Sequence, residues 1–312
     1  MEKSAKIMIV LLSLFLSLQN TYCQTNWYPS SGNVGIGTGV SPSKLLQVAG
    51  GDIDLNTSSK SYMIAGNPVL WQKGIVDNIF VGVGTGTNTT GDRNTFLGYT
   101  AGNTNVAGRA NTFVGYRAGF SNTVGTITYE EASYNTFVGY KAGEFNTVGF
   151  ENSFFGKKAG NANTEGNLNC FAGSHSGVSN TTGYSNTFIG AAAGLNTIDG
   201  FWNTALGNDA GHNNQDGYGN VFVGYNTGNI LIGGTNTSGT NNTFVGSGAA
   251  PWTNGLTNAS AIGYNARVSI SDALILGYYN VNVGIGNDAP QNRLHINSAN
   301  TSQAFAQITI NL

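Results

Sequence analysis

Residues 135–149 read NTFVGYKAGEFNTVG, and this pattern decides the fold because it recurs along most of the chain. Each copy opens on an Asn that precedes an apolar triplet, and most copies are spaced by 17 residues. A fixed period of this kind indicates a repeat architecture in which each copy forms one coil of a stack. The copies begin at Asn78, Asn94, Asn111, Asn135, Asn152, Asn169, Asn186, Asn203 and Asn220.

Glycine occupies fixed positions in the copies, which predicts corners where the backbone has a positive φ or approaches another strand closely. A column that ends the copies comprises Gly108, Gly125, Gly149, Gly166, Gly183, Gly200 and Gly217. A second column, eight residues after the Asn, comprises Gly102, Gly119, Gly143, Gly160, Gly177, Gly194, Gly211 and Gly228. The main corner column, four residues after the Asn, comprises Gly98, Gly115, Gly139, Gly156, Gly173, Gly190, Gly207 and Gly224.

The triplets between the corners, such as TFV, TFL and SFF, favour short strands, because β-branched and aromatic residues suit a pleated surface. One copy has too few apolar residues to bury a core alone, whereas stacked copies bury a continuous one. The expected fold class is therefore all-β, a parallel β-solenoid with coils of 17 residues. A second Asn column predicts turns and side-chain ladders between coils, at Asn105, Asn122, Asn146, Asn163 and Asn180.

One copy is longer than its neighbours. The step from Asn111 to Asn135 is 24 residues, which is seven more than the usual 17. The extra residues fall within residues 126–133, so we expect one coil to carry an outgrowth without disturbing the stack. Loops on rigid scaffolds often carry function, so Tyr129, Glu130 and Glu131 are predicted as a contact loop. The alternative is a solvated loop tip.

The composition excludes several classes of protein. Among 312 residues only 9% are charged and the net charge is −2, so nucleic acid and anionic membranes are not expected partners. The 16 Phe and 14 Tyr residues exclude the disordered class.

The N-terminus predicts export. Residues 1–6 carry charge and residues 7–16 read IMIVLLSLFL, a run too short to span a bilayer, so residues 1–23 are predicted to be a signal peptide cleaved after Cys23. The protein is then secreted or held at the cell surface, without inserting directly into a membrane once the signal is removed. A lipoprotein attached through Cys23 is the alternative, although Tyr22 is bulky for that site. The remaining cysteine, Cys170, falls in the Thr column of the triplets and is expected to be inert.

Two copies of an NVGIG module bracket the repeats. They lie at residues 33–37 and 282–286, and each is followed by a Pro-containing turn and a second apolar segment. The modules resemble segments of bacterial surface and phage tail-fibre proteins. The predicted organisation is a signal peptide at 1–23, an N-terminal β module at 24–60, a capping segment at 61–77, the repeat domain at 78–278 and a C-terminal β module at 279–312.

The last copies shorten to NASAIGYNA at residues 258–266 and ALILG at 273–277. This form resembles the head repeat of trimeric autotransporter adhesins, the YadA-like heads, and the resemblance extends over roughly residues 78–278. It implies a left-handed parallel β-roll that assembles as a homotrimer and adheres to surfaces. The sequence shows neither a heptad stalk nor the strands of a membrane barrel, so we expect one component of a fibre or a fragment of a longer one.

No group of residues predicts catalysis, a metal or a cofactor, so an enzyme is not expected. The histidines His175, His212 and His295 are far apart and share no column of the repeat. In GSHSG, at residues 173–177, a His stands where a nucleophile elbow has Ser.

The expected function is that of a cell-surface adhesin head or fibre segment, which binds an extracellular protein or glycan through many weak contacts. Glycans could stack on an aromatic column, although packing between coils is the alternative for its members Tyr99, Tyr116, Tyr140 and Tyr225. A phage-like tail-fibre segment is a second candidate. An ice-binding solenoid is a third, in which hydroxyls are presented by Thr95, Thr112, Thr136, Thr187 and Thr204, with interruptions at Ser153, Cys170 and Val221.

Overall fold

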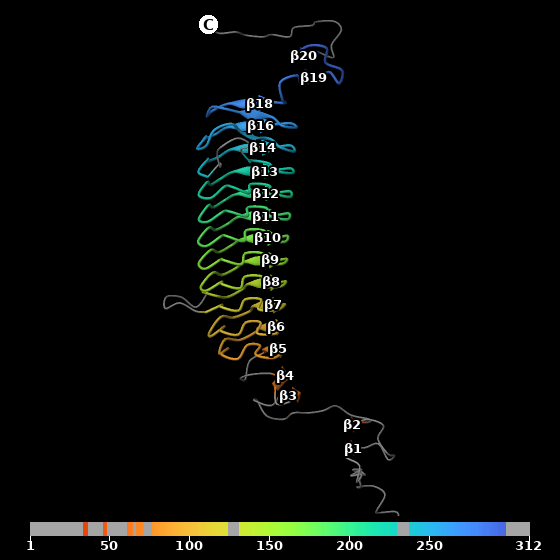
Figure 1. Ribbon diagram of the computed structural model, residues 1–312, viewed down its shortest axis with the longest axis vertical. Helices are drawn as coiled ribbons and strands as arrows, with labels where there is room; N and C mark the ends of the chain where they lie inside the picture. Colours follow the sequence, from red (N-terminus) through yellow and green to blue (C-terminus); the bar gives the residue numbers. More distant parts are fainter. Residues whose placement is uncertain are drawn as a thin grey trace, which may run out of the picture. The chain divides into compact units, whose positions relative to one another are not determined.

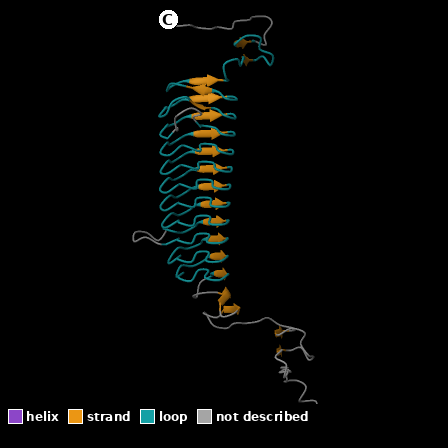
Figure 2. Ribbon diagram, in the orientation of Figure 1, coloured by secondary structure: helices purple, strands orange, loops and turns teal. Residues whose placement is uncertain are grey.

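The computed structural model describes the strands at residues 34–36, 46–48, 61–64 and 67–71 and the segments 77–123, 131–229 and 237–297. These residues contain no helix, and they build a parallel β-solenoid of about 11 turns with coils of ~17 residues (Figures 1 and 2). The predicted all-β class and parallel solenoid are therefore confirmed, whereas the left-handedness of the coil and the trimer remain predictions. The predicted signal peptide lies outside the described residues, and among those described no helix could cross a membrane.

The chain divides into two compact units, Met1–Thr57 and Ser58–Leu312. In the first unit, β1 (Val34–Ile36) pairs in parallel with β2 (Leu46–Val48). In the second unit, β19 (Val283–Ile285) pairs in parallel with β20 (Leu294–Ile296). Both NVGIG segments thus supply a first strand, and the apolar residues after each Pro-containing turn supply its partner.

One sheet of 14 strands forms the long side of the solenoid. At its N-terminal edge β3 (Ser61–Ile64) and β4 (Asn67–Trp71) form an antiparallel hairpin, and β4 is also antiparallel to β5. The other strands of this sheet are parallel to one another: β5 (Ile79–Val81), β6 (Thr95–Leu97), β7 (Thr112–Val114), β8 (Thr136–Val138), β9 (Ser153–Phe155), β10 (Cys170–Ala172), β11 (Thr187–Ile189), β12 (Thr204–Leu206), β13 (Val221–Val223), β14 (Thr243–Val245), β16 (Ser260–Ile262) and β18 (Leu274–Leu276).

A separate pair of short strands lies in the last coils. β15 (Ala250–Pro251) pairs in parallel with β17 (Arg267–Val268). This pair stands outside the 14-stranded sheet, so these coils have strand on a second side.

The longer copy keeps the register of the stack. Thr112, Phe113 and Val114 face Thr136, Phe137 and Val138 across the insertion. Seven residues, 124–130, lie outside the described part of the chain, and Gly125 is among them. The corner carbonyl that accepts the amide of Asn111 is that of Ala132, at 2.8 Å, where most other coils use a glycine. The expected corner at Gly125 is therefore replaced by Ala132, because the extra residues enter the chain just before the corner.

The core is built largely from phenylalanine rings at the middle position of the triplets, a position that Ala205, Ala261 and Ile275 hold in β12, β16 and β18. Phe137 and Phe154 have ring centroids 4.8 Å apart and planes within 8°. This separation matches the spacing of about 4.8 Å between neighbouring strands, so from Phe80 to Phe188 each ring lies directly on the ring of the previous coil. A column of small buried residues, which includes Ala142 and Ala159, also belongs to the core. Each coil therefore contributes little more than one ring and one small side chain.

The corner glycines take conformations that L side chains rarely adopt. The eight members of the main corner column have φ between 131° and 145°. At Gly139 a Cβ would stand 2.4 Å from the carbonyl oxygen of Gly156. At Gly143, where φ is 55°, a Cβ would stand 2.5 Å from the ring of Phe137. The first corner is thus too close to the next coil, and the second too close to the core, for any side chain.

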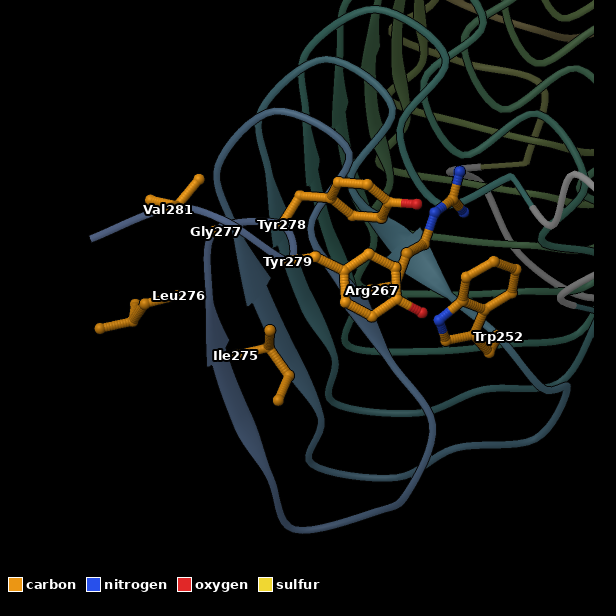
Figure 3. A pocket seen from close by; sticks show the side chains of 8 residues that line it. All are labelled: Trp252, Arg267, Ile275, Leu276, Gly277, Tyr278, Tyr279 and Val281. Carbon is orange, nitrogen blue, oxygen red and sulfur yellow. The ribbon is translucent and has the colours of Figure 1, made fainter. Parts of the chain in front are cut away.

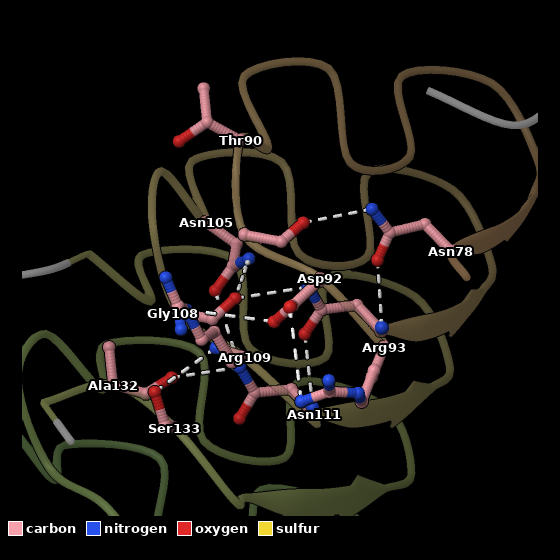
Figure 4. A network of polar contacts seen from close by, with 12 residues as sticks. Asn78, Thr90, Asp92, Arg93, Asn105, Gly108, Arg109, Asn111, Ala132 and Ser133 are labelled. Atoms are coloured by element: carbon pink, nitrogen blue, oxygen red, sulfur yellow. Dashed lines mark hydrogen bonds and ion pairs between the residues drawn. The ribbon is translucent and has the colours of Figure 1, made fainter. Parts of the chain in front are cut away.

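The Asn that precedes the triplets from β5 to β14 bonds to the backbone at two points, and Ala259 and Ala273 take its place before β16 and β18. Asn135 donates through Nδ2 to the carbonyl of Gly149 at 2.9 Å, which closes its own coil. Its Oδ1 accepts the backbone N–H of Asn152 in the next coil at 3.0 Å. Figure 4 shows the polar network around Asn78 and Asn111, in which Asn111 donates to the carbonyl of Ala132. Because the amide side chain is buried and hydrogen-bonded, each coil with such an Asn is tied both to itself and to its neighbour.

The second Asn column forms the predicted ladder. Asn146 donates to Oδ1 of Asn122 at 2.7 Å, and Asn163 donates to Oδ1 of Asn146 at 2.6 Å. The ladder runs from Asn105 to Asn180, and Thr197 then takes the next position.

Candidate binding surfaces

The outer face of the 14-stranded sheet carries two parallel stripes of side chains, because residues one and three of each triplet point away from the core. We call these stripes the sheet face. The third position is apolar throughout, in the series Leu97, Val114, Val138, Phe155, Ala172, Ile189, Leu206, Val223, Val245, Ile262 and Leu276. The first position is hydroxylic or small in most coils, and no Lys, Arg, Asp or Glu occupies either stripe. The sheet face is thus long, uncharged and partly exposed.

The hydroxyl stripe is broken where the sequence indicated. Cys170 pairs in register with Thr187, and Val221 with Thr204. Both interruptions therefore lie within the Thr column itself, so the longest unbroken run of Thr in it is Thr95, Thr112 and Thr136.

The predicted tyrosine column packs between coils over its first three members. The rings of Tyr99 and Tyr116 lie 5.6 Å apart and those of Tyr116 and Tyr140 lie 5.2 Å apart, with planes within 10°. A sugar stacks on the face of a ring, and here neighbouring rings cover most of those faces. The stack therefore presents mainly ring edges and hydroxyls, whereas the exposed Tyr225 stands apart from it.

A second aromatic stack was not anticipated from the sequence. Tyr184, Phe201 and Tyr218 stack at 4.9 and 4.8 Å, and Trp202 meets Phe201 edge-on at 5.1 Å. The three stacked residues each stand two positions before the Asn of a copy, so their 17-residue spacing was a usable signal.

The predicted contact loop is only partly described. Tyr129 and Glu130 lie outside the described residues. Glu131 is half-buried, and its Oε2 has no hydrogen-bond partner among the described residues.

The buried carboxylate of Glu144 was also not predicted from the sequence. Glu144 is buried and contacts Nε of Arg117 at 2.5 Å, Nζ of Lys141 at 3.3 Å and Nδ2 of Asn161 at 3.2 Å. The guanidinium of Arg117 also lies 4.0 Å from the ring centre of Phe120. Two cations and an amide thus satisfy the acid, as a structural network requires.

The histidines are separate from one another. Burial, with Lys157 and Lys158 nearby, lowers the pKa of His175. Nδ1 of His212 lies 3.0 Å from Oδ1 of Asp209. Over the described ranges no cluster of three or more His, Cys, Asp or Glu side chains could hold a metal ion.

Comparisons with models of protein families, with curated proteins and with solved structures found no match for this chain.

Proposed function

We propose that this protein is an exported, homotrimeric β-roll that serves as an adhesin head or fibre segment at the cell surface. The sheet face is the observation that carries the proposal. Strands from β5 to β18 at about 4.8 Å per step make it roughly 50 Å long, and one triplet makes it roughly 10 Å wide. The resulting area is about 500 Å², of which the apolar third positions supply one of the two stripes, and exposed continuous apolar surfaces often mark interaction sites.

Assembly follows from the thinness of the coil. A core of one ring and one small residue per coil leaves the apolar third position of every triplet partly in water. Packing these stripes against other copies removes that surface from solvent without burying a charge. The adhesin-like repeat at residues 258–277 supports three copies as the number.

Attachment then arises from repetition. Three copies of a stack present the same side chains many times, and linked weak contacts raise the overall avidity 10²- to 10⁴-fold over a single contact, in order of magnitude. The ligand proposed is an extracellular protein or glycan.

An ice-binding solenoid is the second candidate, because partly exposed Thr residues recur in register along the sheet. Flat hydroxyl arrays need continuity, and the breaks at Cys170 and Val221 count against it. Thermal hysteresis of the purified protein decides: a measurable freezing-point gap supports ice binding, and its absence excludes it.

A phage-like tail-fibre segment is a further candidate, because the two NVGIG modules resemble segments of tail-fibre proteins.

Adherence tests the main proposal directly. Inert beads coated with residues 24–312 should bind protein- or glycan-coated surfaces more than beads coated with an unrelated protein do. The assembly-deficient variant described in the Discussion should lose most of this binding. Equal binding by both kinds of bead would contradict the proposal.

A further inference from the structure

A pocket of about 310 Å³ lies in the last coils of the solenoid (Figure 3). Its lining residues are Arg267 of β17 together with Trp252, Ile275, Leu276, Gly277, Tyr278, Tyr279 and Val281. The volume lies at the lower end of the range for ligand pockets, about 300–1,000 Å³, so it suits a small ligand group. Arg267 is the one charged residue of the lining.

Arg267 is a buried cation that has no acidic partner among the described residues. Only 9% of its surface is exposed, and no carboxylate among the described residues forms an ion pair with it. One guanidinium nitrogen donates to the carbonyl of Asn229 at 3.1 Å, and the guanidinium carbon lies 5.5 Å from the ring centre of Trp252. Burial lowers the pKa of Arg267, as expected for a cation withdrawn from water, although arginine stays protonated in proteins. A ligand carboxylate would supply the missing charge, and it matches the planar guanidinium fork.

Aromatic side chains surround this cation. Figure 3 shows Trp252, Tyr278 and Tyr279 turned toward Arg267, whereas Leu276 points away. The rings of Tyr278 and Tyr279 meet edge-on with centroids 4.5 Å apart. Unlike the stacked tyrosines, they therefore do not cover each other's faces. They leave an exposed ring face at Tyr279 together with hydroxyl and indole N–H groups that can bind ligand hydroxyls.

We propose that this pocket binds the carboxylate-bearing sugar unit of an acidic glycan, such as a uronic or sialic acid residue. Arg267 pairs with the carboxylate, and Trp252 and Tyr279 contact the ring and its hydroxyls. A sugar is favoured over a peptide carboxyl group because the lining combines ring faces with hydroxyl and indole groups around a single cation. The proposal gives a ligand class to the proposed adhesin function and rests on it for its biological role.

Titration of the purified protein tests the proposal. The probes are methyl β-D-glucuronide and the methyl glycoside of N-acetylneuraminic acid, with methyl β-D-glucoside, acetate and an N-acetylated dipeptide as comparisons. Binding is followed through the indole N–H signal of Trp252 by NMR. At least one acidic sugar should saturate in the millimolar range and bind about 10-fold more tightly than the glucoside, acetate or dipeptide. Absence of saturation by both acidic sugars, or equal binding of acetate or the dipeptide, overturns the proposal.

Two variants locate the site. Arg267→Gln should weaken binding of the acidic sugar about 10-fold or more. Tyr279→Ala should weaken it several-fold without unfolding the protein, because Tyr279 is 73% exposed. Tyr264→Ala is the matched control, since Tyr264 is 72% exposed and does not line the pocket, and it should bind as the unaltered protein does. If Arg267→Gln does not fold, unchanged binding by Tyr279→Ala alone refutes the site.

The experiments distinguish a failure of the pocket proposal from a failure of the adhesin proposal. A trimer that binds no acidic sugar refutes the pocket alone, whereas a monomer that binds the sugar refutes the assembly alone.

Discussion

Oδ1 of Asn180 and Oγ1 of Thr197 are buried in adjacent coils, and neither has a hydrogen-bond partner among the described residues. Asn180 is the last residue that donates within the continuous amide ladder. Thr197 occupies the next position, and its side chain does not donate to Oδ1 of Asn180. The short Thr side chain thus ends the ladder at this coil, and the buried Oγ1 of Thr89, in the same column at the other end, likewise has no partner among the described residues.

Thr197→Asn should repair this break. Its Nδ2 would donate to Oδ1 of Asn180, as Asn180 itself donates to Asn163 at 2.7 Å. Forming a buried hydrogen bond and satisfying an orphaned acceptor should stabilise the protein by about 1 kcal/mol, and thermal unfolding by circular dichroism would record a higher Tm. The same change at exposed Thr182 should have little effect. A lower Tm for Thr197→Asn would refute the ladder as a source of stability.

Phe154→Ala should remove one ring from the core stack. Phe154 is completely buried between Phe137 and Phe171, so truncation should cost about 3–5 kcal/mol of unfolding free energy. Phe145→Ala is the matched control, because that side chain is 47% exposed and lies outside the triplets, so its truncation should cost less than about 1 kcal/mol. Urea unfolding of both variants makes the comparison. Similar losses would contradict a core built from the middle residue of each triplet.

Asp216→Asn should stabilise the protein at neutral pH. Burial, a hydrogen bond to Asp199 and repulsion by that carboxylate raise the pKa of Asp216. A raised pKa in the folded state means that stability is gained as pH falls through that pKa and lost as pH rises through it. The variant should therefore exceed the unaltered protein in stability at pH 7, and the difference should shrink as the carboxyl protonates. Urea unfolding over a pH series measures this, and a difference independent of pH would contradict the stated cause.

Ile189→Lys should disrupt assembly through the sheet face. Ile189 is 45% exposed in the apolar stripe, and a lysine there would place a charge in the proposed interface. Ile198 is 41% exposed but lies outside the triplets, so Ile198→Lys should leave the oligomer intact. Size-exclusion chromatography distinguishes the two. Equal behaviour of the variants would show that the interface lies elsewhere.

The repeat made the fold predictable, since a 17-residue period defined the strands, the corners and the Asn ladder before any contact was known. Contacts between residues that do not recur with this period were not predicted. Glu144 gains its partners from Arg117, 27 residues away, and from Asn161, 17 residues away, and a single carboxylate leaves no columnar signal.

The Arg267 pocket was missed for a related reason. Trp252, Arg267 and Tyr279 come from the shortened last coils, where the side chains no longer repeat. Only the three-dimensional stacking of these coils brings the residues together.

The mass of residues 24–312 in solution, measured by light scattering, tests the central claim most directly. The proposed homotrimer predicts three times the mass of one chain, and one third of that value for Ile189→Lys. A stable, folded monomer of the unaltered chain would contradict the proposal that the sheet face joins three copies.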